Sequence, residues 1–295
     1  MFKISNCLFI YTETPLHPGS GTSLGYVDLP VQREKHTGFP MIQASGIKGA
    51  LREEMEESPE DRKKVEVIFG KWESSNTASC VSFSDGRLLL FPVPSFRSVF
   101  AWATCPFLLK RFERDMEWAG KKIEMNVPEI KEAEAVVSPD SILCVDDKVV
   151  LGEYTFNVKH DASLGDIAKN FSPALPPSLA DDLVKRIVLL PDDTMRDFTR
   201  LFTEVITRIR INKETKTVNT GGLWTEEYIP PETLFYSVVL IHAPYAKDEE
   251  LENEEEVRNF LEERISSRTF YRLGGNETVG KGIVRITFQG VKNGN

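Results

Sequence analysis

The sequence contains little cysteine, and no two cysteines lie close together. Its four cysteines are scattered along 295 residues without a CxxC pair. Zinc sites and disulfide scaffolds are signalled by cysteines at short, regular spacings. The sequence therefore signals neither, and we expect buried free thiols at Cys7, Cys80, Cys105 and Cys144.

The sequence also lacks a long hydrophobic run. No apolar segment approaches the roughly 20 residues that span a bilayer, and the N-terminus has no basic start followed by an apolar stretch and a cleavage site. With 41% hydrophobic and 10% aromatic residues, the chain can still bury a full core. We predict a soluble, cytoplasmic protein with no membrane partner and, because no repeat or low-complexity linker interrupts it, one domain over residues 1–295.

A positive net charge is missing as well. The formal net charge of −9 argues against a nucleic-acid partner, because the phosphate backbone is normally met by a basic surface. However, residues 248–263 hold nine of the 45 acidic side chains and one of the 36 basic ones, so the rest of the chain is nearly neutral. Val257, Phe260, Leu261 and Ile265 recur there at helical spacing, which predicts a helix with its acidic face turned away from RNA.

Residues 14–40 form a long connection between a predicted strand, residues 2–11, and a predicted helix. Structureless connections longer than roughly 12–15 residues are uncommon in compact domains and are usually functional or disordered. Side chains that favour a function here are His17, Tyr26, Asp28, Arg33 and His36. His17 and Asp28 are the best placed for catalysis, although Asp28 also suits a turn before Leu29-Pro30.

The predicted helix that follows, residues 44–52, begins in a way that suits an anion. Its apolar residues recur at the spacing of a buried face: Ile47, Leu51 and Met55. Ser45 is the expected N-cap, and Lys48 and Arg52 share another face. A lysine near a helix N-terminus is unfavourable unless an anion binds there. The N-terminus of this helix is therefore predicted to bind a phosphate group. The alternative is that Lys48 is an ordinary solvated lysine.

A glycine-rich loop lies between two predicted strands near the C-terminus. Within residues 274–282 it contains Gly274, Gly275, Gly280, Lys281 and Gly282. Such a loop can adopt positive φ at several positions, so that successive N–H groups converge on an anion, and the lysine adds positive charge. The alternative is a long hairpin connection.

Residues 205–218 form an amphipathic pattern followed by a polar turn. In a strand, Arg208 and Arg210 lie on one face and Ile209 and Ile211 on the other. Arginines and apolar side chains on one hairpin can meet phosphates and wedge between bases. An ordinary amphipathic edge hairpin is the alternative.

Other segments read as ordinary strands and helices. We predict a hairpin over residues 81–91 with an Asp-Gly turn, a helix over 107–114 with its basic residues outside, an insertion over 121–147, two short helices between 178 and 202, and a strand over 235–241.

Three of these features, in this order, resemble the RAMP superfamily of CRISPR proteins: the Leu16-His17-Pro18-Gly19 loop, the helix over 44–52 and the C-terminal glycine-rich loop. Residues 89–95 and 226–231 make the chain look like the repeated backbone subunit of the type III-B (Cmr) effector complex, an RNA-guided ribonuclease. The resemblance implies an α+β fold with a ferredoxin-like (RRM-like) antiparallel sheet and large insertions. One insertion would be a protruding β-hairpin thumb at residues 204–224.

The resemblance also implies partners and a reaction. The partners are a CRISPR guide RNA, a complementary target RNA, further copies of the chain in a filament and other Cmr subunits. Asp28 matches the loop aspartate required for cutting target RNA, and His17 matches a nearby motif histidine for which we favour a loop-ordering role. Glu227, beside Glu226 and Tyr228, is a third catalytic candidate, although such a charged pair is more often on the surface.

A single carboxylate cannot hold a divalent ion alone. A Mg²⁺ or Mn²⁺ ion at Asp28 would have to take most of its ligands from RNA phosphate and water. RNA-binding candidates are Ser45, Lys48, Arg52, Arg208, Arg210, Gly274, Gly275, Gly280, Lys281 and Gly282. Two alternatives stay open: a scaffold that binds guide RNA without cutting, and a standalone repeat-processing ribonuclease with His17 as general base.

Overall fold

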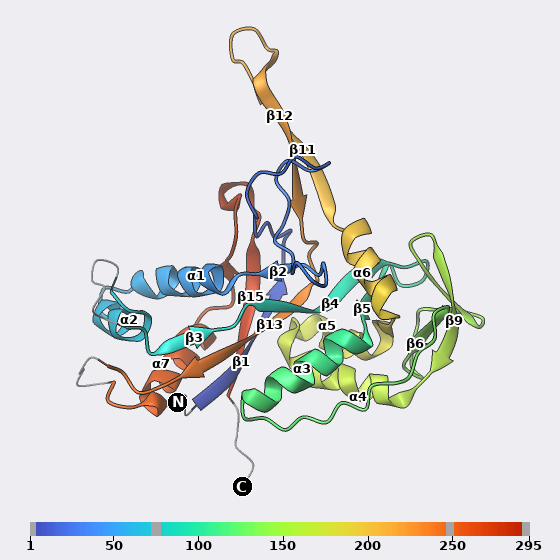
Figure 1. The fold of residues 1–295 in the computed structure, drawn as a ribbon, viewed down its shortest axis with the longest axis horizontal. Helices are drawn as coiled ribbons and strands as arrows, with labels where there is room; N and C mark the ends of the chain where they lie inside the picture. Colours follow the sequence, from blue (N-terminus) through green and yellow to red (C-terminus); the bar gives the residue numbers. More distant parts are fainter. Residues whose placement is uncertain (1–3, 72–77, 246–250, 291–295) are drawn as a thin grey trace.

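One large β-sheet runs through the molecule, and the computed structural model describes residues 4–71, 78–245 and 251–290 of the chain (Figure 1). Within these described residues the sheet has 13 strands, and only two of its strand pairs, β10 with β5 and β6 with β9, are parallel. The sheet order is β14 (Tyr271–Arg272), β15 (Ile283–Gly290), β1 (Ile4–Thr12), β13 (Leu234–Ile241), β4 (Gly86–Pro94), β5 (Phe100–Thr104), β10 (Ile187–Leu189), β6 (Glu134–Val137), β9 (Tyr154–His160), β8 (Lys148–Leu151) and β7 (Cys144–Val145). Two short strands lie off this path, β2 (Met41–Ile42) beside β4 and β3 (Val81–Phe83) beside β13.

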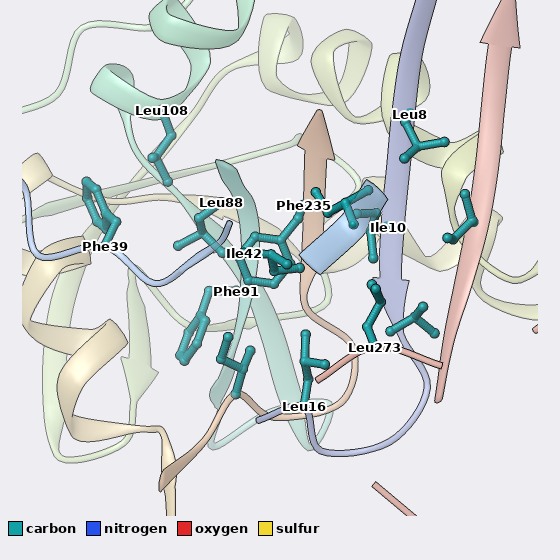
Figure 2. Close-up of a cluster of buried hydrophobic side chains, with 14 of the residues drawn as sticks. Leu8, Ile10, Leu16, Phe39, Ile42, Leu88, Phe91, Leu108, Phe235 and Leu273 are labelled. Atoms are coloured by element: carbon teal, nitrogen blue, oxygen red, sulfur yellow. The ribbon is translucent and has the colours of Figure 1, made fainter. Parts of the chain in front are cut away.

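Helices cover both faces of the sheet, because its central strands are apolar on both sides. Leu8 and Ile10 of β1 pack into one hydrophobic layer, and Phe9 and Tyr11 pack into the other. The first layer, part of which Figure 2 shows, includes side chains from α1 (Ala44–Glu56), α2 (Arg62–Phe69), α6 (Asp192–Leu201) and α7 (Glu254–Ser266). The second includes side chains from α3 (Pro106–Trp118), α4 (Ala162–Phe171) and α5 (Pro177–Arg186). The predicted α+β class with an antiparallel sheet is therefore confirmed in this coarse form.

A two-stranded hairpin stands apart from the sheet and projects from the body of the protein (Figure 1). It consists of β11 (Glu204–Ile211) and β12 (Val218–Tyr228), so it extends four residues beyond the range 204–224 expected for a thumb. The hairpin follows directly on α6. Ile209 and Ile211 of this hairpin are about half exposed, at 53% and 51%. We call this element the thumb hairpin below.

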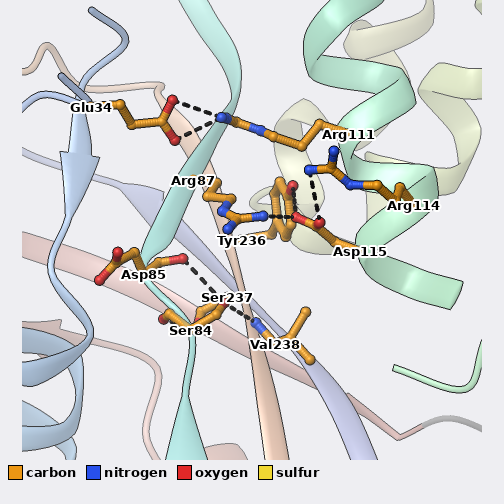
Figure 3. Close-up of polar contacts among 10 residues, drawn as sticks. All are labelled: Glu34, Ser84, Asp85, Arg87, Arg111, Arg114, Asp115, Tyr236, Ser237 and Val238. Atoms are coloured by element: carbon orange, nitrogen blue, oxygen red, sulfur yellow. Dashed lines mark hydrogen bonds and ion pairs between the residues drawn. The ribbon is translucent and has the colours of Figure 1, made fainter. Parts of the chain in front are cut away.

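The hairpin predicted over residues 81–91 is wrong. Strands β3 and β4 lie end to end along β13, which pairs with Phe83 through Val239 and with Arg87 through Tyr236. Between β3 and β4 the backbone pairing with β13 is interrupted. There the Ser84 hydroxyl accepts a hydrogen bond from the Val238 amide at 2.8 Å (Figure 3). An Asp-Gly pair therefore marks an interruption here and not a reversal of the chain.

Helix α3 confirms the helix expected over residues 107–114, but one of its basic residues points inward. Arg111 is buried, with an exposed fraction of 5%, and its Nη1 lies 2.7 Å from both carboxylate oxygens of Glu34 (Figure 3). The pair ties the long N-terminal loop to α3. Beside it, Asp115 pairs with Arg87 and accepts a hydrogen bond from the Tyr236 hydroxyl at 2.7 Å.

Other predicted elements agree with the structure to different degrees. Helices α5 and α6 confirm the two short helices expected between residues 178 and 202, but the three-residue strand β10 between them was missed. Within residues 121–147, expected as an insertion, β6 lies inside the large sheet. The acidic helix is confirmed as α7, which has a capping box at Asn253 and Glu256, while residues 248–250 of that acidic segment lie outside the described residues.

All four cysteines are free, as expected. Cys7, Cys80 and Cys105 are buried, and Cys144 is half-buried. Burial raises the pKa of Cys80 to about 11. In the part of the chain that the structure describes, no helix has both the length and the apolar character needed to cross a membrane.

Candidate RNA-cleavage site at the base of the thumb hairpin

The long N-terminal loop is ordered because it pairs with the base of the thumb hairpin. Leu16 and Ile229 exchange two backbone hydrogen bonds, at 2.9 and 2.8 Å. Further along, the Leu29 amide donates to the Thr225 carbonyl and the Glu227 amide donates to the Leu29 carbonyl, each at 3.0 Å. Residues around Leu29 therefore act as a short parallel strand along β12, and the loop is fixed at both its entry and its return.

Asp28 lies at the point where the loop returns to β12. Its side chain is exposed, and its Oδ2 accepts hydrogen bonds from the amide and the hydroxyl of Thr225, at 2.8 and 2.9 Å. The Asp28 amide donates back to the same hydroxyl at 2.9 Å. The backbone and side-chain hydrogen bonds from Thr225 lower the pKa of Asp28. Asp28 is thus an ionised carboxylate in a fixed position that remains open to solvent.

His17 is buried between the loop and the thumb strand, with 8% of its surface exposed. Its Nδ1–H donates to the Glu227 carbonyl at 2.7 Å, and its own carbonyl accepts from the Gly275 amide at 2.9 Å. The ring lies 5.4 Å from the Tyr228 ring. These contacts fit the loop-ordering role favoured for His17 better than the role of a general base.

Glu226 and Tyr228 form a polar cluster that the sequence interpretation left unresolved. The Glu226 carboxylate accepts hydrogen bonds from Arg208 at 3.2 Å, Trp224 at 2.8 Å and Asn276 at 3.0 Å, and another from the Tyr228 hydroxyl. Burial acts to raise the pKa of Glu226, but the hydrogen bonds from Tyr228, Trp224 and Arg208 outweigh it and lower that pKa. The available signal was the alternation of Trp224, Glu226 and Tyr228 along one strand face, opposite Arg208.

Glu227 is buried and fully engaged, so the expectation of a surface residue is wrong. Its Oε1 accepts from Arg33 Nη2 at 2.6 Å and from the Thr203 hydroxyl at 2.8 Å, and its Oε2 accepts from the Val31 amide at 3.0 Å. Only 6% of the residue is exposed. A carboxylate with these partners is an anchor for the loop, and the catalytic role predicted for Glu227 is not supported.

The glycine-rich loop packs against the N-terminal loop. The Gly275 amide donates to the His17 carbonyl and the Gly282 amide donates to the Pro15 carbonyl, each at 2.9 Å. Gly280 and Lys281 donate their amides within the loop itself, to Glu277 and Asn276. These four N–H groups are therefore not available to an anion, which corrects that part of the prediction.

The glycines instead allow the backbone of this loop to lie close to the backbone of the N-terminal loop. A Cβ on Gly274 would lie 2.5 Å from the His17 carbonyl oxygen, and the residue has a φ of +77°. Lys281 remains a charged side chain at the site, with its Nζ 4.9 Å from the centre of the Tyr228 ring. Among the predicted residues, the structure thus gathers His17, Arg208, Glu227, Lys281 and the glycines of this loop around residues 226–228 of β12. Asp28 is joined to the same strand through Thr225.

Helix α1 differs from its predicted details. The N-cap is Gln43 and not Ser45, and the Ala44 amide donates to Asp85 Oδ1 at 2.8 Å. Ser45 is exposed, while Arg52 is buried and pairs with Glu56 at 2.6 Å, so Arg52 does not lie on an RNA-facing surface.

Lys48 and Arg210 remain candidates outside the cluster. Lys48 is half-buried, and burial, followed by the charge of Arg52, lowers its pKa. Helix α1 packs against β14, the strand that leads into the glycine-rich loop, so Lys48 and that loop belong to neighbouring elements. Arg210 is exposed further along the thumb hairpin.

The residues at the site can fit a divalent cation only in part. Among the described residues, no group of three or more His, Cys, Asp or Glu side chains could hold a metal ion. Asp28 offers one ionised, exposed carboxylate in which both hydrogen bonds from Thr225 reach Oδ2. A hard oxygen ligand of this kind suits Mg²⁺, which commonly keeps waters and phosphate oxygens as its other ligands.

Comparisons with known proteins agree on one family. A family model of the RAMP superfamily matches residues 9–285. The chain is 43% identical over 290 residues to the CRISPR system Cmr endoribonuclease Cmr4 of Pyrococcus furiosus, covering 96% of this chain and 95% of that protein.

Solved structures give the same result. A crystal structure of oligomeric Cmr4 from Pyrococcus furiosus superposes with a TM-score of 0.76 at 34% identity, covering 98% of this chain and 100% of that one. A chain in the cryo-EM structure of the type III-B Cmr-beta complex bound to cognate target RNA gives a TM-score of 0.75 at 25% identity, covering 97% and 98%.

Proposed function

The chain belongs to the RAMP superfamily, and from that premise we propose that it is the endoribonuclease subunit of a type III-B Cmr complex. It assembles with further copies of itself and other Cmr subunits along a guide RNA, and it cuts complementary target RNA at regular intervals. The similarity to the Pyrococcus endoribonuclease over 96% of the chain supports the activity. The similarity to a chain in a target-RNA-bound complex supports the RNA partner.

The single observation that carries the chemistry is the exposed, ionised Asp28 at the base of the thumb hairpin. Thr225 holds its carboxylate in place and lowers its pKa. A carboxylate with a lowered pKa is a weak base but a good ligand for a hard cation. Asp28 therefore orients the reacting ribose and phosphate, and with RNA phosphates it would hold a divalent cation, Mg²⁺ or Mn²⁺.

In the proposed reaction the target 2′-oxygen loses its proton to water and bonds to the adjacent phosphorus, the bond from phosphorus to the 5′-oxygen breaks, and the 5′-oxygen takes a proton from water. The products are a 2′,3′-cyclic phosphate and a 5′-hydroxyl. When bound, the cation supplies positive charge that favours the ionised 2′-oxygen and stabilises the charged phosphate. Lys281, beside the Tyr228 ring, adds a positive charge at the base of the thumb hairpin.

RNA binding follows from features around this site. Guide phosphates lie near α1 and the glycine-rich loop, where Ser45, Lys48 and Lys281 are the groups available to them. The thumb hairpin presents Arg210 and exposed apolar side chains to the duplex and distorts it. Sequence choice comes from base pairing with the guide, while the protein reads backbone and shape.

The proposal includes a ferredoxin-like (RRM-like) core. The order β15-β1-β13-β4, with every neighbouring pair antiparallel, supports it, as do α1 and α7, which follow β1 and β13 and pack in one layer. The cytoplasmic location remains a prediction.

The test is target cleavage by the assembled complex. A labelled complementary RNA is presented to complexes that contain either wild-type protein or Asp28→Asn, with magnesium or with EDTA. We expect a ladder of evenly spaced products from the wild type with magnesium, and a loss of at least ~100-fold in rate for Asp28→Asn with RNA binding retained. Unchanged cleavage by Asp28→Asn would favour the non-catalytic scaffold.

A further inference from the structure

The Glu227 carboxylate joins three segments that are far apart in the sequence. It accepts hydrogen bonds from Arg33 Nη2 at 2.6 Å, from the Val31 amide at 3.0 Å and from the Thr203 hydroxyl at 2.8 Å. Val31 and Arg33 belong to the return of the N-terminal loop, Thr203 is the residue before β11, and Glu227 itself is in β12. One side chain thus links the loop that carries Asp28 to β12 and to the residue just before β11.

Arg33 extends this junction to α6. The same Nη2 that contacts Glu227 also donates to the Thr199 carbonyl at 3.0 Å, and Nη1 donates to the Gly38 carbonyl at 3.1 Å. Thr199 is buried in α6, the helix from which the thumb hairpin emerges. The guanidinium therefore fixes the loop at the point where the thumb hairpin leaves the body of the protein.

The backbone of Glu227 adds two further connections. Its amide donates to the Leu29 carbonyl at 3.0 Å, and its carbonyl accepts from His17 Nδ1 at 2.7 Å. Leu29 is the neighbour of Asp28 in the chain. Removing the side-chain contacts of Glu227 would therefore loosen the segment that sets the position of the Asp28 carboxylate.

The burial of Glu227 and its pairing with Arg33 indicate which role the Glu227 carboxylate can have. The Glu227 side chain is 9% exposed and that of Arg33 is 19% exposed. A buried carboxylate that is paired and hydrogen-bonded is costly to disturb, because loss of one partner leaves the other unsatisfied. Both oxygens are bonded to protein partners and the side chain is buried, so Glu227 is not exposed to a substrate or an ion.

We infer that Glu227 is a positioning residue: together with Arg33 it locks the Asp28 loop and the thumb hairpin into one unit, so that RNA seated on the hairpin is presented to Asp28 in register. This inference rests on the proposed function, since it assigns a task to Glu227 within that cleavage site. It predicts that the junction controls the rate of cutting and has little effect on RNA affinity.

The test uses the assembled complex at saturating target RNA, with Glu227→Gln, Arg33→Gln and the double variant. Misplacement of a reacting group by about 1 Å can cost ~100-fold in rate. We expect each single variant to lower the single-turnover cleavage rate about 10–100-fold, with the dissociation constant for target RNA changed less than about threefold. Because both residues act through one junction, the double variant should be no slower than the slower single variant.

Asp61→Asn is the matched control. Asp61 is also a buried carboxylate, 2% exposed, and it pairs with Arg264 at 2.9 Å between α2 and α7, away from the site. It should lower thermal stability as the junction variants do, but leave the cleavage rate unchanged. If Glu227→Gln does not assemble, Thr203→Val removes one of the three contacts to the carboxylate and should give a smaller rate loss in the same direction.

The outcomes separate this inference from the proposed function. Loss of cleavage in Asp28→Asn with wild-type rates in the junction variants would overturn the positioning role alone. Parallel losses of affinity and rate would overturn it too, because they would indicate a structural role. Full cleavage by Asp28→Asn would overturn the proposed function itself.

Discussion

At the scale of single residues, the site depends on hydrogen bonds that the chain supplies to Asp28. Thr225 gives that carboxylate its backbone amide and its hydroxyl, and both lower its pKa. The carboxylate is therefore ionised at neutral pH before RNA arrives. Sequence reasoning found Asp28 through its place in a long loop and through the family resemblance, but it did not find Thr225, which lies 197 residues away.

Replacing Thr225 with valine should raise the pKa of Asp28 part of the way to its ordinary value, because the hydroxyl is lost and the amide remains. Because the pKa of Asp28 is lowered in the native protein, the contact with Thr225 stabilises the fold when Asp28 is ionised. Stability from this contact is present above the pKa of the unfolded chain and is lost as pH falls through the native pKa. An NMR titration of the Asp28 carboxyl group in Thr225→Val measures the shift.

Thr207→Val is the control for that titration, since Thr207 faces Thr225 across the hairpin and the hydrogen bonds to the Asp28 carboxylate come from Thr225. An unchanged Asp28 pKa in Thr225→Val, or an equal shift in Thr207→Val, would contradict the assigned cause.

At the scale of elements, the glycine-rich loop serves packing more than anion binding. The sequence correctly predicted a connection between two strands, and β14 and β15 pair as expected. It could not show that the loop amides are already used by the N-terminal loop and by the glycine-rich loop itself, because those partners depend on tertiary contacts. The same limit applies to Arg111 of α3, which was expected to be exposed but pairs with Glu34 of the N-terminal loop, 77 residues away.

Two glycines of this loop allow a matched test. Gly274 and Gly280 have nearly equal φ values, +77° and +76°, but an added Cβ meets the His17 carbonyl at 2.5 Å in the first and nothing within 4 Å in the second. Gly280→Ala should therefore cost only the left-handed backbone penalty, about 1–2 kcal/mol. Gly274→Ala should cost roughly 2–5 kcal/mol, because overpacking adds to that penalty.

The measurement is the free energy of unfolding in urea for both variants. Equal losses of stability in the two variants would show that the close contact between Gly274 and the His17 carbonyl does not limit the residue at position 274. A larger loss in Gly274→Ala, accompanied by slower target cleavage in the assembled complex, is the expected result.

At the scale of the whole molecule, the fold brings three distant parts of the chain to one place. The N-terminal loop, the base of the thumb hairpin and the glycine-rich loop meet through backbone hydrogen bonds and the contacts of His17 and Glu226. Strand β13, a continuous β-prone run, and helix α7, with apolar residues at helical spacing, could be predicted from sequence. Short strands such as β10, and the choice between Glu226 and Glu227, could not, because neighbouring elements decide them.

Target cleavage by this chain depends most on Asp28 reaching the target strand beside the thumb hairpin. The direct measurement is a structure of the assembled Asp28→Asn complex with guide and an intact, uncleaved target RNA. We predict one target 2′-oxygen within hydrogen-bond reach of residue 28, roughly 3 Å, or joined to it through one water or ion. If every target 2′-oxygen instead lies beyond roughly 8 Å, too far for one bridging water or ion, the account is contradicted.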